Sequence, residues 1–154
     1  MRTSDVSLTV MLPTSLTNAY QAITNWEAQS DWMIGTKVWL SQGDGSSIDS
    51  EISAFTGIGK LGFLDTMTIT KLEPPRLVEV LHTGKVLRGE GRFELTEIGP
   101  DQTRFDWFER VEIPFGVAGL LAWWLIRPGF TFGVWYSLRK LAKSLELGTG
   151  RLGK

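Results

Sequence analysis

Residues 62–76 of the chain read GFLDTMTITKLEPPR, and this stretch indicates the fold class. Polar and apolar side chains alternate up to the two prolines, which is typical of a strand with one face toward a protein interior. The pattern predicts a strand over 61–73, a turn at Pro74-Pro75 and a second strand over 76–84. Two consecutive strands joined by so short a turn pair antiparallel.

Within the first of these strands, an acid shares a face with large apolar side chains. Counting in twos from Ile69 places Met67, Asp65 and Phe63 on one side of the strand. A carboxylate that faces an apolar interior is costly unless another group pairs with it or the interior holds water or a ligand. We therefore expect an internal cavity behind this strand rather than a solid core.

The segments on either side predict further strands and two short helices. Residues 4–12 alternate as a strand, a helix begins near Pro13-Thr14, and a second helical turn covers about 26–32. Glycine- and proline-containing turns then separate six strands in a row. Their predicted ranges are 35–42, 47–55, 61–73, 76–84, 86–98 and 102–113.

The hydrophobic period changes near the end of the chain. Apolar residues recur there at helical spacing, namely Phe132, Trp135, Leu138, Leu141, Ala142 and Leu145. We predict a helix over about 130–147, with Pro128 in its first turn and Gly148 at its stop. The predicted fold is α+β: a curved antiparallel sheet of six to seven strands around a long C-terminal helix. No linker or repeat interrupts it, so residues 1–154 are expected to form one domain.

The apolar segment Ile113–Ile126 lies between the last strand and this helix. It contains one proline and two glycines and is shorter than the ~20 apolar residues that a membrane-spanning helix needs. We interpret it as a buried connector. A lid that dips into a lipid interface and a partner contact are the alternatives, and no stable membrane insertion is expected.

This order of elements, together with several motifs, resembles the START-like helix-grip superfamily, which contains the birch-pollen-allergen proteins, polyketide cyclases/dehydrases and lipid-transfer domains. The motifs are Thr24-Asn25-Trp26 followed by Trp32, the Glu73-Pro74-Pro75-Arg76 turn, and the run 82–93 with Trp107-Phe108-Glu109 and Ser137-Leu138-Arg139. The last group is similar to actinobacterial polyketide cyclase/dehydrase-like proteins. The resemblance covers nearly the whole chain and implies a helix-grip fold, which carries binding, transport and catalysis alike.

Three ionisable residues are predicted to point into the interior from different strands. Period-two counting places His82 with Val78 and Val80, and Glu109 with Phe105 and Trp107, while Asp65 lies on the inner face described above. Such a group in an apolar pocket has displaced pKa values, as general acid–base chemistry requires. A buried hydrogen-bonded cluster that fixes strand register is the alternative, and we favour it.

Aromatic residues are numerous and gather in the second half of the chain. They serve both cores and ligand pockets, because they bury large apolar areas with few rotamers. Arg88 is ambiguous: strict alternation points it outward, whereas a bulge at the following glycines would turn it inward. The candidate ligand-binding residues are Phe63, Met67, Arg88, Phe93, Phe105, Trp107, Trp123, Phe132 and Trp135, around a cavity of several hundred Å³.

Composition excludes several classes of function. The net charge of −1 argues against nucleic acid as a partner, and one histidine without any cysteine argues against a metal centre or a thiol nucleophile. No cofactor is expected, and the start lacks a signal-peptide pattern, so the cytoplasm is the expected compartment. We interpret the chain as a binder of a hydrophobic small molecule such as a polyketide, lipid or isoprenoid, with cyclase or dehydratase activity as one version. The alternatives are a lipid or quinone carrier and an interaction protein with a filled core.

Overall fold

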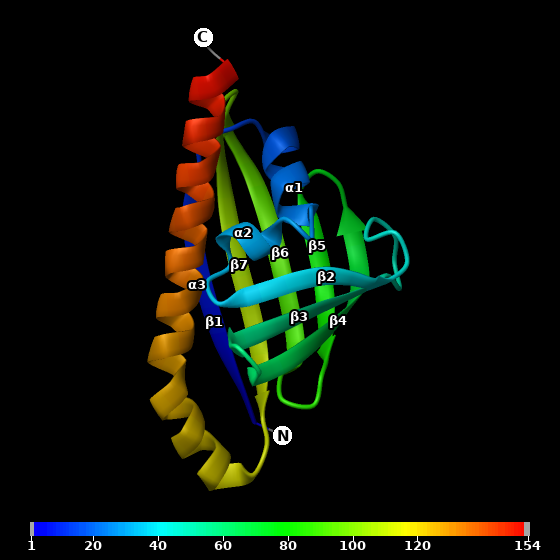
Figure 1. The fold of residues 1–154 in the computed structure, drawn as a ribbon, viewed down its shortest axis with the longest axis vertical. Helices are drawn as coiled ribbons and strands as arrows, with labels where there is room; N and C mark the ends of the chain where they lie inside the picture. The colour runs from blue at the N-terminus through cyan, green and yellow to red at the C-terminus, as the bar shows by residue number, and fades with distance from the viewer. Residues whose placement is uncertain (1, 153–154) are drawn as a thin grey trace.

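The computed structural model describes residues 2–152, with side chains for residues 2–148. It contains one antiparallel sheet and three helices, arranged as Figure 1 shows. The strands are β1 (Arg2–Leu12), β2 (Thr36–Gln42), β3 (Glu51–Ile58), β4 (Leu61–Glu73), β5 (Leu77–Thr83), β6 (Arg88–Gly99) and β7 (Gln102–Ile113). The helices are α1 (Leu16–Thr24), α2 (Gln29–Trp32) and α3 (Gly116–Leu152).

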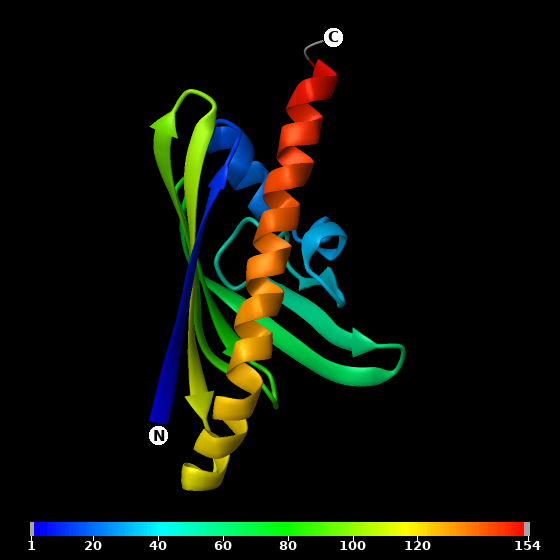
Figure 2. The same ribbon diagram turned by 90° about the vertical axis from the view of Figure 1, so that its left-hand side faces the viewer.

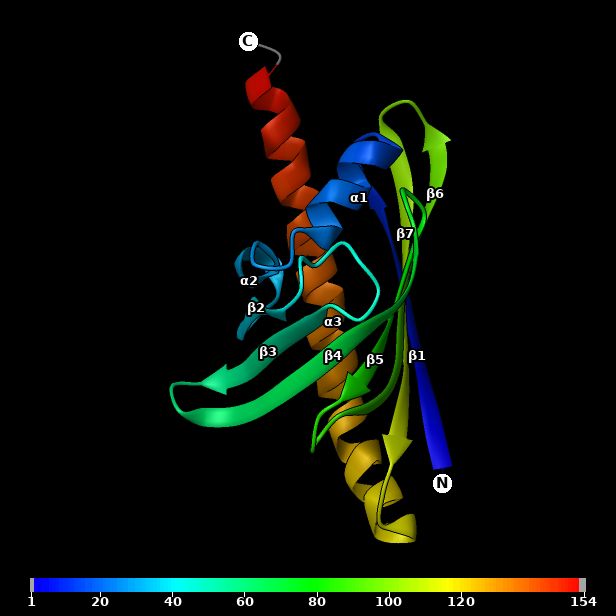
Figure 3. The same cartoon turned by 90° about the vertical axis from the view of Figure 1, so that its right-hand side faces the viewer.

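The seven strands form one sheet in the order β1-β7-β6-β5-β4-β3-β2, so every neighbouring pair except β1 and β7 is consecutive in sequence. The sheet twists strongly, and β2, β3 and the start of β4 bend away from the other strands (Figures 2 and 3). α3 packs across the concave side of the sheet (Figure 3). α1 and α2 cover the same side and lie closer to β2 than α3 does. The predicted α+β helix-grip arrangement is confirmed.

The core lies between this concave face and α3. α1 begins after Ser15, whose hydroxyl accepts a hydrogen bond from the Asn18 N–H and so caps the helix. In β7 every second residue is buried, which places Phe105 and Trp107 in the core. α3 contributes to the same core by the helically spaced residues Val134, Leu138 and Leu141.

The predicted extent of α3 was wrong. The helix begins at Gly116 rather than near residue 130, runs through Pro128 and continues past Gly148, which is therefore not a stop. A proline removes one N–H and leaves the carbonyl four residues earlier, that of Trp124, without a helical partner. Because residues 124–129 are exposed, water can satisfy that carbonyl, and the proline does not end the helix.

The interpretation of Ile113–Ile126 as a buried connector was also wrong. The segment forms the last residue of β7 and the first turns of α3, and no residue from 114 to 129 is buried. The first turns of α3 extend past the end of the sheet, so the strands do not cover them (Figure 1). The predicted strand over 47–55 begins later, at Glu51, because residues 43–50 form a loop.

Candidate functional site

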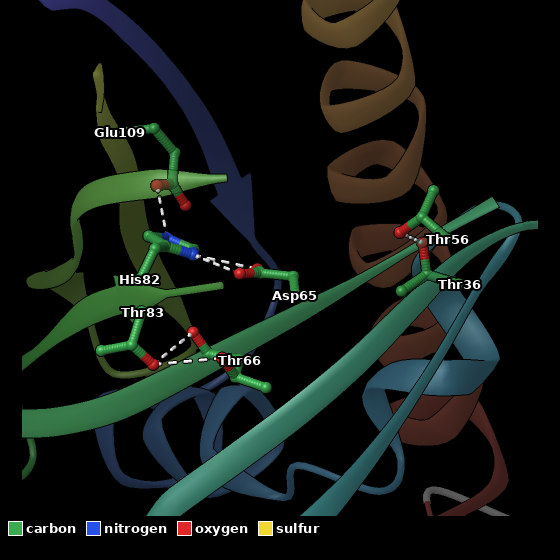
Figure 4. Close-up of polar contacts among 7 residues, drawn as sticks. All are labelled: Thr36, Thr56, Asp65, Thr66, His82, Thr83 and Glu109. Atoms are coloured by element: carbon green, nitrogen blue, oxygen red, sulfur yellow. Dashed lines mark hydrogen bonds and ion pairs between the residues drawn. The ribbon is translucent and has the colours of Figure 1, made fainter. Parts of the chain in front are cut away.

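Asp65, His82 and Glu109 meet in the interior of the sheet, where all three side chains are buried. The His82 Nδ1 lies 3.0 and 2.9 Å from the two carboxylate oxygens of Asp65, and Nε2 lies 2.8 Å from Glu109 Oε2. Figure 4 shows the imidazole held between the two acids. We call these three residues the acid–histidine cluster.

Strand register explains how three separate strands supply the cluster. His82 on β5 pairs with Met67 on β4, so Asp65 lies diagonally across from it on the same face. β6 separates β5 from β7, and the residues that it places beside His82 and Glu109 are Gly89 and Gly91. Because neither has a side chain, His82 reaches across β6 to Glu109.

Gly91 is the site residue that sequence reasoning missed. A Cβ atom at this position would lie 2.9 Å from Val80 Cγ2, 3.1 Å from His82 Nε2 and 3.2 Å from Glu109 Oε2. The signal in the sequence was Gly89-Glu90-Gly91, two glycines at inward positions of one strand, which we interpreted only as a possible bulge. Their function here is to make room for a hydrogen bond between strands that are not neighbours.

Replacing Gly91 with alanine is expected to lower the free energy of unfolding by ~1–3 kcal/mol, as inserted methyl groups do in packed interiors. The methyl would push against the His82–Glu109 hydrogen bond and against Val80 together. Urea denaturation measures the change. Gly99→Ala on the same strand is the control, since its methyl would meet no atom within 4 Å; an equal loss in both variants would contradict this role of Gly91.

The electrostatics of the cluster favour a charged imidazole. Burial opposes the protonated form of His82, but the charge of Glu109 and the hydrogen bonds to Asp65 and Glu109 outweigh it, and together they raise the pKa of His82 to about 10. At neutral pH His82 is therefore an imidazolium between two carboxylates, and the cluster carries one net negative charge. Both ring N–H groups donate to those carboxylates, which leaves the remaining carboxylate lone pairs as acceptors for another molecule.

The cluster lines a cavity between the sheet and the two helices α2 and α3. We call it the inner cavity; its volume is about 80 Å³, smaller than the several hundred Å³ that we predicted. Larger grooves of about 830 and 670 Å³ run between β1 and α3, but they are open to solvent and do not reach the cluster. The inner cavity is lined by Trp26, Gln29, Met33, Thr36, Val38, Ala54, Thr56, Phe63, Asp65, Met67, Val80, His82, Leu87, Phe93, Trp107, Glu109, Phe130 and Val134.

Four of the predicted ligand-binding residues lie on this cavity: Phe63, Met67, Phe93 and Trp107. Trp107 is the most informative, because its indole N–H is buried and, among the described residues, has no hydrogen-bond partner. A buried donor without an acceptor costs ~1–3 kcal/mol, which a ligand oxygen could recover. The α3 residues that do reach the cavity, Phe130 and Val134, were not among the predicted ones.

Five predicted ligand-binding residues do not line the inner cavity. Phe105 lies behind the wall, where its ring packs edge-on against Phe93 at 5.4 Å. Arg88 points outward, as strict alternation indicates, and its nearest acid is Glu112 at 3.7 Å. The other three lie on α3, which presents Phe130 and Val134 to the cavity instead; they are Trp123, Phe132 and Trp135.

The chain has the START-like helix-grip fold. Its sequence matches no family model and no curated protein. Among solved structures, the Zhui aromatase/cyclase from Streptomyces sp. R1128 is similar, with a TM-score of 0.78, 11% identity and 94% of each chain covered.

A START superfamily protein from Mycobacterium smegmatis is similar over 96% of this chain and 98% of its own, with a TM-score of 0.67 and 20% identity. The di-domain aromatase/cyclase BexL matches 97% of this chain with a TM-score of 0.73 and 13% identity, and 48% of its own length is covered. At these identities the comparisons establish the fold.

Proposed function

We propose that this protein binds a neutral, hydrophobic small molecule in the inner cavity and orients it through the acid–histidine cluster. The observation that carries the proposal is the placing of a buried charged cluster on a mainly apolar cavity wall, whose other polar residues are Gln29, Thr36 and Thr56. Ligand sites in proteins combine these two features, an apolar lining and a few convergent polar groups. The solved aromatase/cyclases with the same fold support a ligand of polyketide-like chemistry.

The polarity of the cavity favours one class of ligand. The acid–histidine cluster offers hydrogen-bond acceptors, and the Trp107 indole offers a donor that has no partner. Among the described residues, no lysine or arginine lines the cavity, so a ligand carboxylate would meet net negative charge without a counter-ion. A molecule with both a hydroxyl and a carbonyl, such as a hydroxyaryl ketone, can donate to the carboxylates of the cluster and accept from the Trp107 indole.

The volume of the inner cavity requires movement on binding. About 80 Å³ holds two or three water molecules, whereas sites for drug-sized ligands measure ~300–1,000 Å³. α3 forms one wall through Phe130 and Val134, and its preceding segment 114–129 is attached by no buried residue. A larger cavity with the least disturbance of the core therefore requires displacement of this part of α3.

Two kinds of function are compatible with such a site. In an enzyme of the cyclase or dehydratase type, a carboxylate of the cluster takes a proton from the bound molecule and becomes a carboxylic acid, and the negative charge left on that molecule lies near the His82 imidazolium. The hydrogen bonds of His82 favour the second kind, a carrier of a lipid, quinone or polyketide. Both of its N–H groups are engaged by carboxylates, so neither is free to protonate a ligand.

Titration with naphthol and naphthoate tests the proposal, because the two probes share one ring system and differ in charge. We expect naphthol to quench tryptophan fluorescence with saturation, and naphthoate to bind at least tenfold more weakly. Trp107→Phe should keep the melting temperature, since it removes the unpartnered N–H, and weaken naphthol binding. Equal affinity for both probes, or no saturable binding of either, would overturn the proposal. Release of a transformed product from a polyketide substrate would distinguish the enzyme from the carrier.

A further inference from the structure

The first half of α3 is mainly apolar on all sides, yet this protein buries very little of it. By length and composition, Gly116–Gly148 meets the requirements of a helix that crosses a membrane, and only 6% of its most apolar window is buried. A helix that is apolar all round is normally covered by a protein core or by lipid. The sheet does not extend far enough to cover the first turns, as Figures 1 and 2 show.

Most exposed apolar residues of α3 lie in one broad row along the helix. Counting about 100° per residue, the row begins beside the core-facing residues Val134, Leu138 and Leu141 and extends around the helix away from them. Its most exposed members are Trp124 at 73% and Leu125 at 72%. The whole row, which we call the outer stripe, consists of Val117, Leu121, Trp124, Leu125, Phe132, Trp135 and Tyr136.

From Gly116 to Leu145 the charged residues of α3 are all basic, and the first acid of the helix is Glu146. The sequence contains no acidic residue between Glu112 and Glu146. The outer stripe continues, at the same helical spacing, into the exposed residues Arg139, Lys140 and Lys143. The guanidinium of Arg139 also lies 5.6 Å from the centre of the Trp135 ring. Aromatic and aliphatic side chains that continue into basic residues are the pattern of helices that bind anionic bilayer surfaces.

Phe115, which directly precedes α3, adds an independent observation. Its φ is 65°, a left-handed conformation that is unfavourable for a bulky residue, and its side chain is 85% exposed. A glycine would adopt the same conformation without strain. An aromatic side chain at this corner therefore does not stabilise the fold. Contact between the exposed Phe115 ring and an apolar surface outside the protein accounts for its presence.

We propose that this protein docks on anionic lipid bilayers through Phe115 and the outer stripe. The apolar first half of α3 lies among the acyl chains near the headgroups, and Arg139, Lys140 and Lys143 contact lipid phosphates. A second copy of the chain fits less well, because the outer stripe carries no acid to pair with the basic residues of a partner's stripe. The docked helix half is the same segment that must move to enlarge the inner cavity, although the docking inference does not depend on ligand binding.

Co-sedimentation with phosphatidylcholine vesicles, with and without half phosphatidylglycerol, tests the inference with the full chain. We expect binding to the anionic vesicles with a blue shift of tryptophan emission, and at least tenfold weaker partitioning onto pure phosphatidylcholine. Trp124→Ser/Leu125→Ser should weaken partitioning at least tenfold. Ile98→Ser, at an apolar position on β6 that is 48% exposed, should leave it unchanged.

Phe115→Gly separates docking from folding, because the two effects run in opposite directions. The variant should melt at the same or a higher temperature and bind anionic vesicles several-fold more weakly. Replacement of the three basic residues by glutamine should abolish the preference for phosphatidylglycerol. The inference is overturned if the wild-type protein binds neither kind of vesicle. It is also overturned if the wild type is a dimer that Trp124→Ser/Leu125→Ser converts to a monomer, or if the bound protein resists extraction by alkaline carbonate, as a spanning helix does.

Discussion

Replacing His82 with alanine is expected to lower the free energy of unfolding at pH 7 by ~3–5 kcal/mol, the usual cost of breaking a buried ion pair on one side. The change leaves Asp65 and Glu109 buried and close together with no cation between them. Urea denaturation monitored by tryptophan fluorescence measures the loss.

The same substitution in an Asp65→Asn/Glu109→Gln background is the control. With neutral neighbours, loss of the imidazole removes hydrogen bonds but no charge pair, so His82→Ala should cost much less there. A cost that is equal in both backgrounds would show that the cluster acts through packing alone. In that case, the charge-based selection of ligands proposed above would lose its foundation.

Phe105→Ala is expected to cost ~3–5 kcal/mol, as large-to-small substitutions of buried aromatic residues do. The Phe105 side chain has no exposed surface, and its ring contacts those of Phe93 and Trp107, which form the cavity wall. The resulting void adjoins the inner cavity, so the variant should also bind hydrophobic dyes more strongly than the wild type does. Thermal and chemical denaturation measure the first effect, and dye fluorescence measures the second.

Phe108→Ala is the matched control for this prediction, since Phe108 lies on the same strand with its side chain on the other face. Its half-exposed ring stacks only against the guanidinium groups of Arg92 and Arg110, at 5.1 and 5.5 Å. The expected cost is about 1 kcal/mol or less, in line with exposed cation–π contacts. A larger effect at Phe108 than at Phe105 would contradict the assignment of inner and outer faces.

Strand alternation was a reliable guide to the candidate site. Counting in twos placed Asp65, His82 and Glu109 on inner faces, and the structure brings them within hydrogen-bond distance. The rule works because side chains of a strand point to opposite faces whatever the tertiary context. Strand alternation does not predict how much space surrounds these side chains. Gly91 matters only because β6 happens to lie between His82 and Glu109, and that depends on sheet order.

α3 shows the opposite case, in which sequence reasoning failed for a physical reason. Helical periodicity identifies an apolar face but does not say what covers it, and we assumed that the protein itself would. Pro114, Gly116 and Gly119, with Arg127-Pro128 closing the segment, then suggested a buried connector. The inner face of the helix was also placed wrongly, because Phe132 and Trp135 lie on the outer surface and Phe130 and Val134 line the inner cavity.

The charged state of the acid–histidine cluster also sets the pH dependence of stability. The pKa of His82 is raised in the folded protein, to about 10, above the ~6.5 of an unperturbed imidazole. The stabilisation is therefore complete below about pH 6.5 and is lost as the pH rises through the folded-state value. Unfolding free energies should fall between pH 7 and 10, and the Asp65→Asn/Glu109→Gln variant should lack that fall.

The most direct test of a buried imidazolium at the candidate site is a ¹⁵N NMR titration of the imidazole. The chain contains one histidine, so the two ring nitrogens of His82 give unambiguous signals. We predict that both nitrogens carry protons at pH 7, and that the ring titrates near pH 10. Addition of naphthol should perturb the signals while naphthoate leaves them unchanged. A neutral ring at pH 7, with one protonated nitrogen and a titration at or below the ordinary histidine value, would contradict the account.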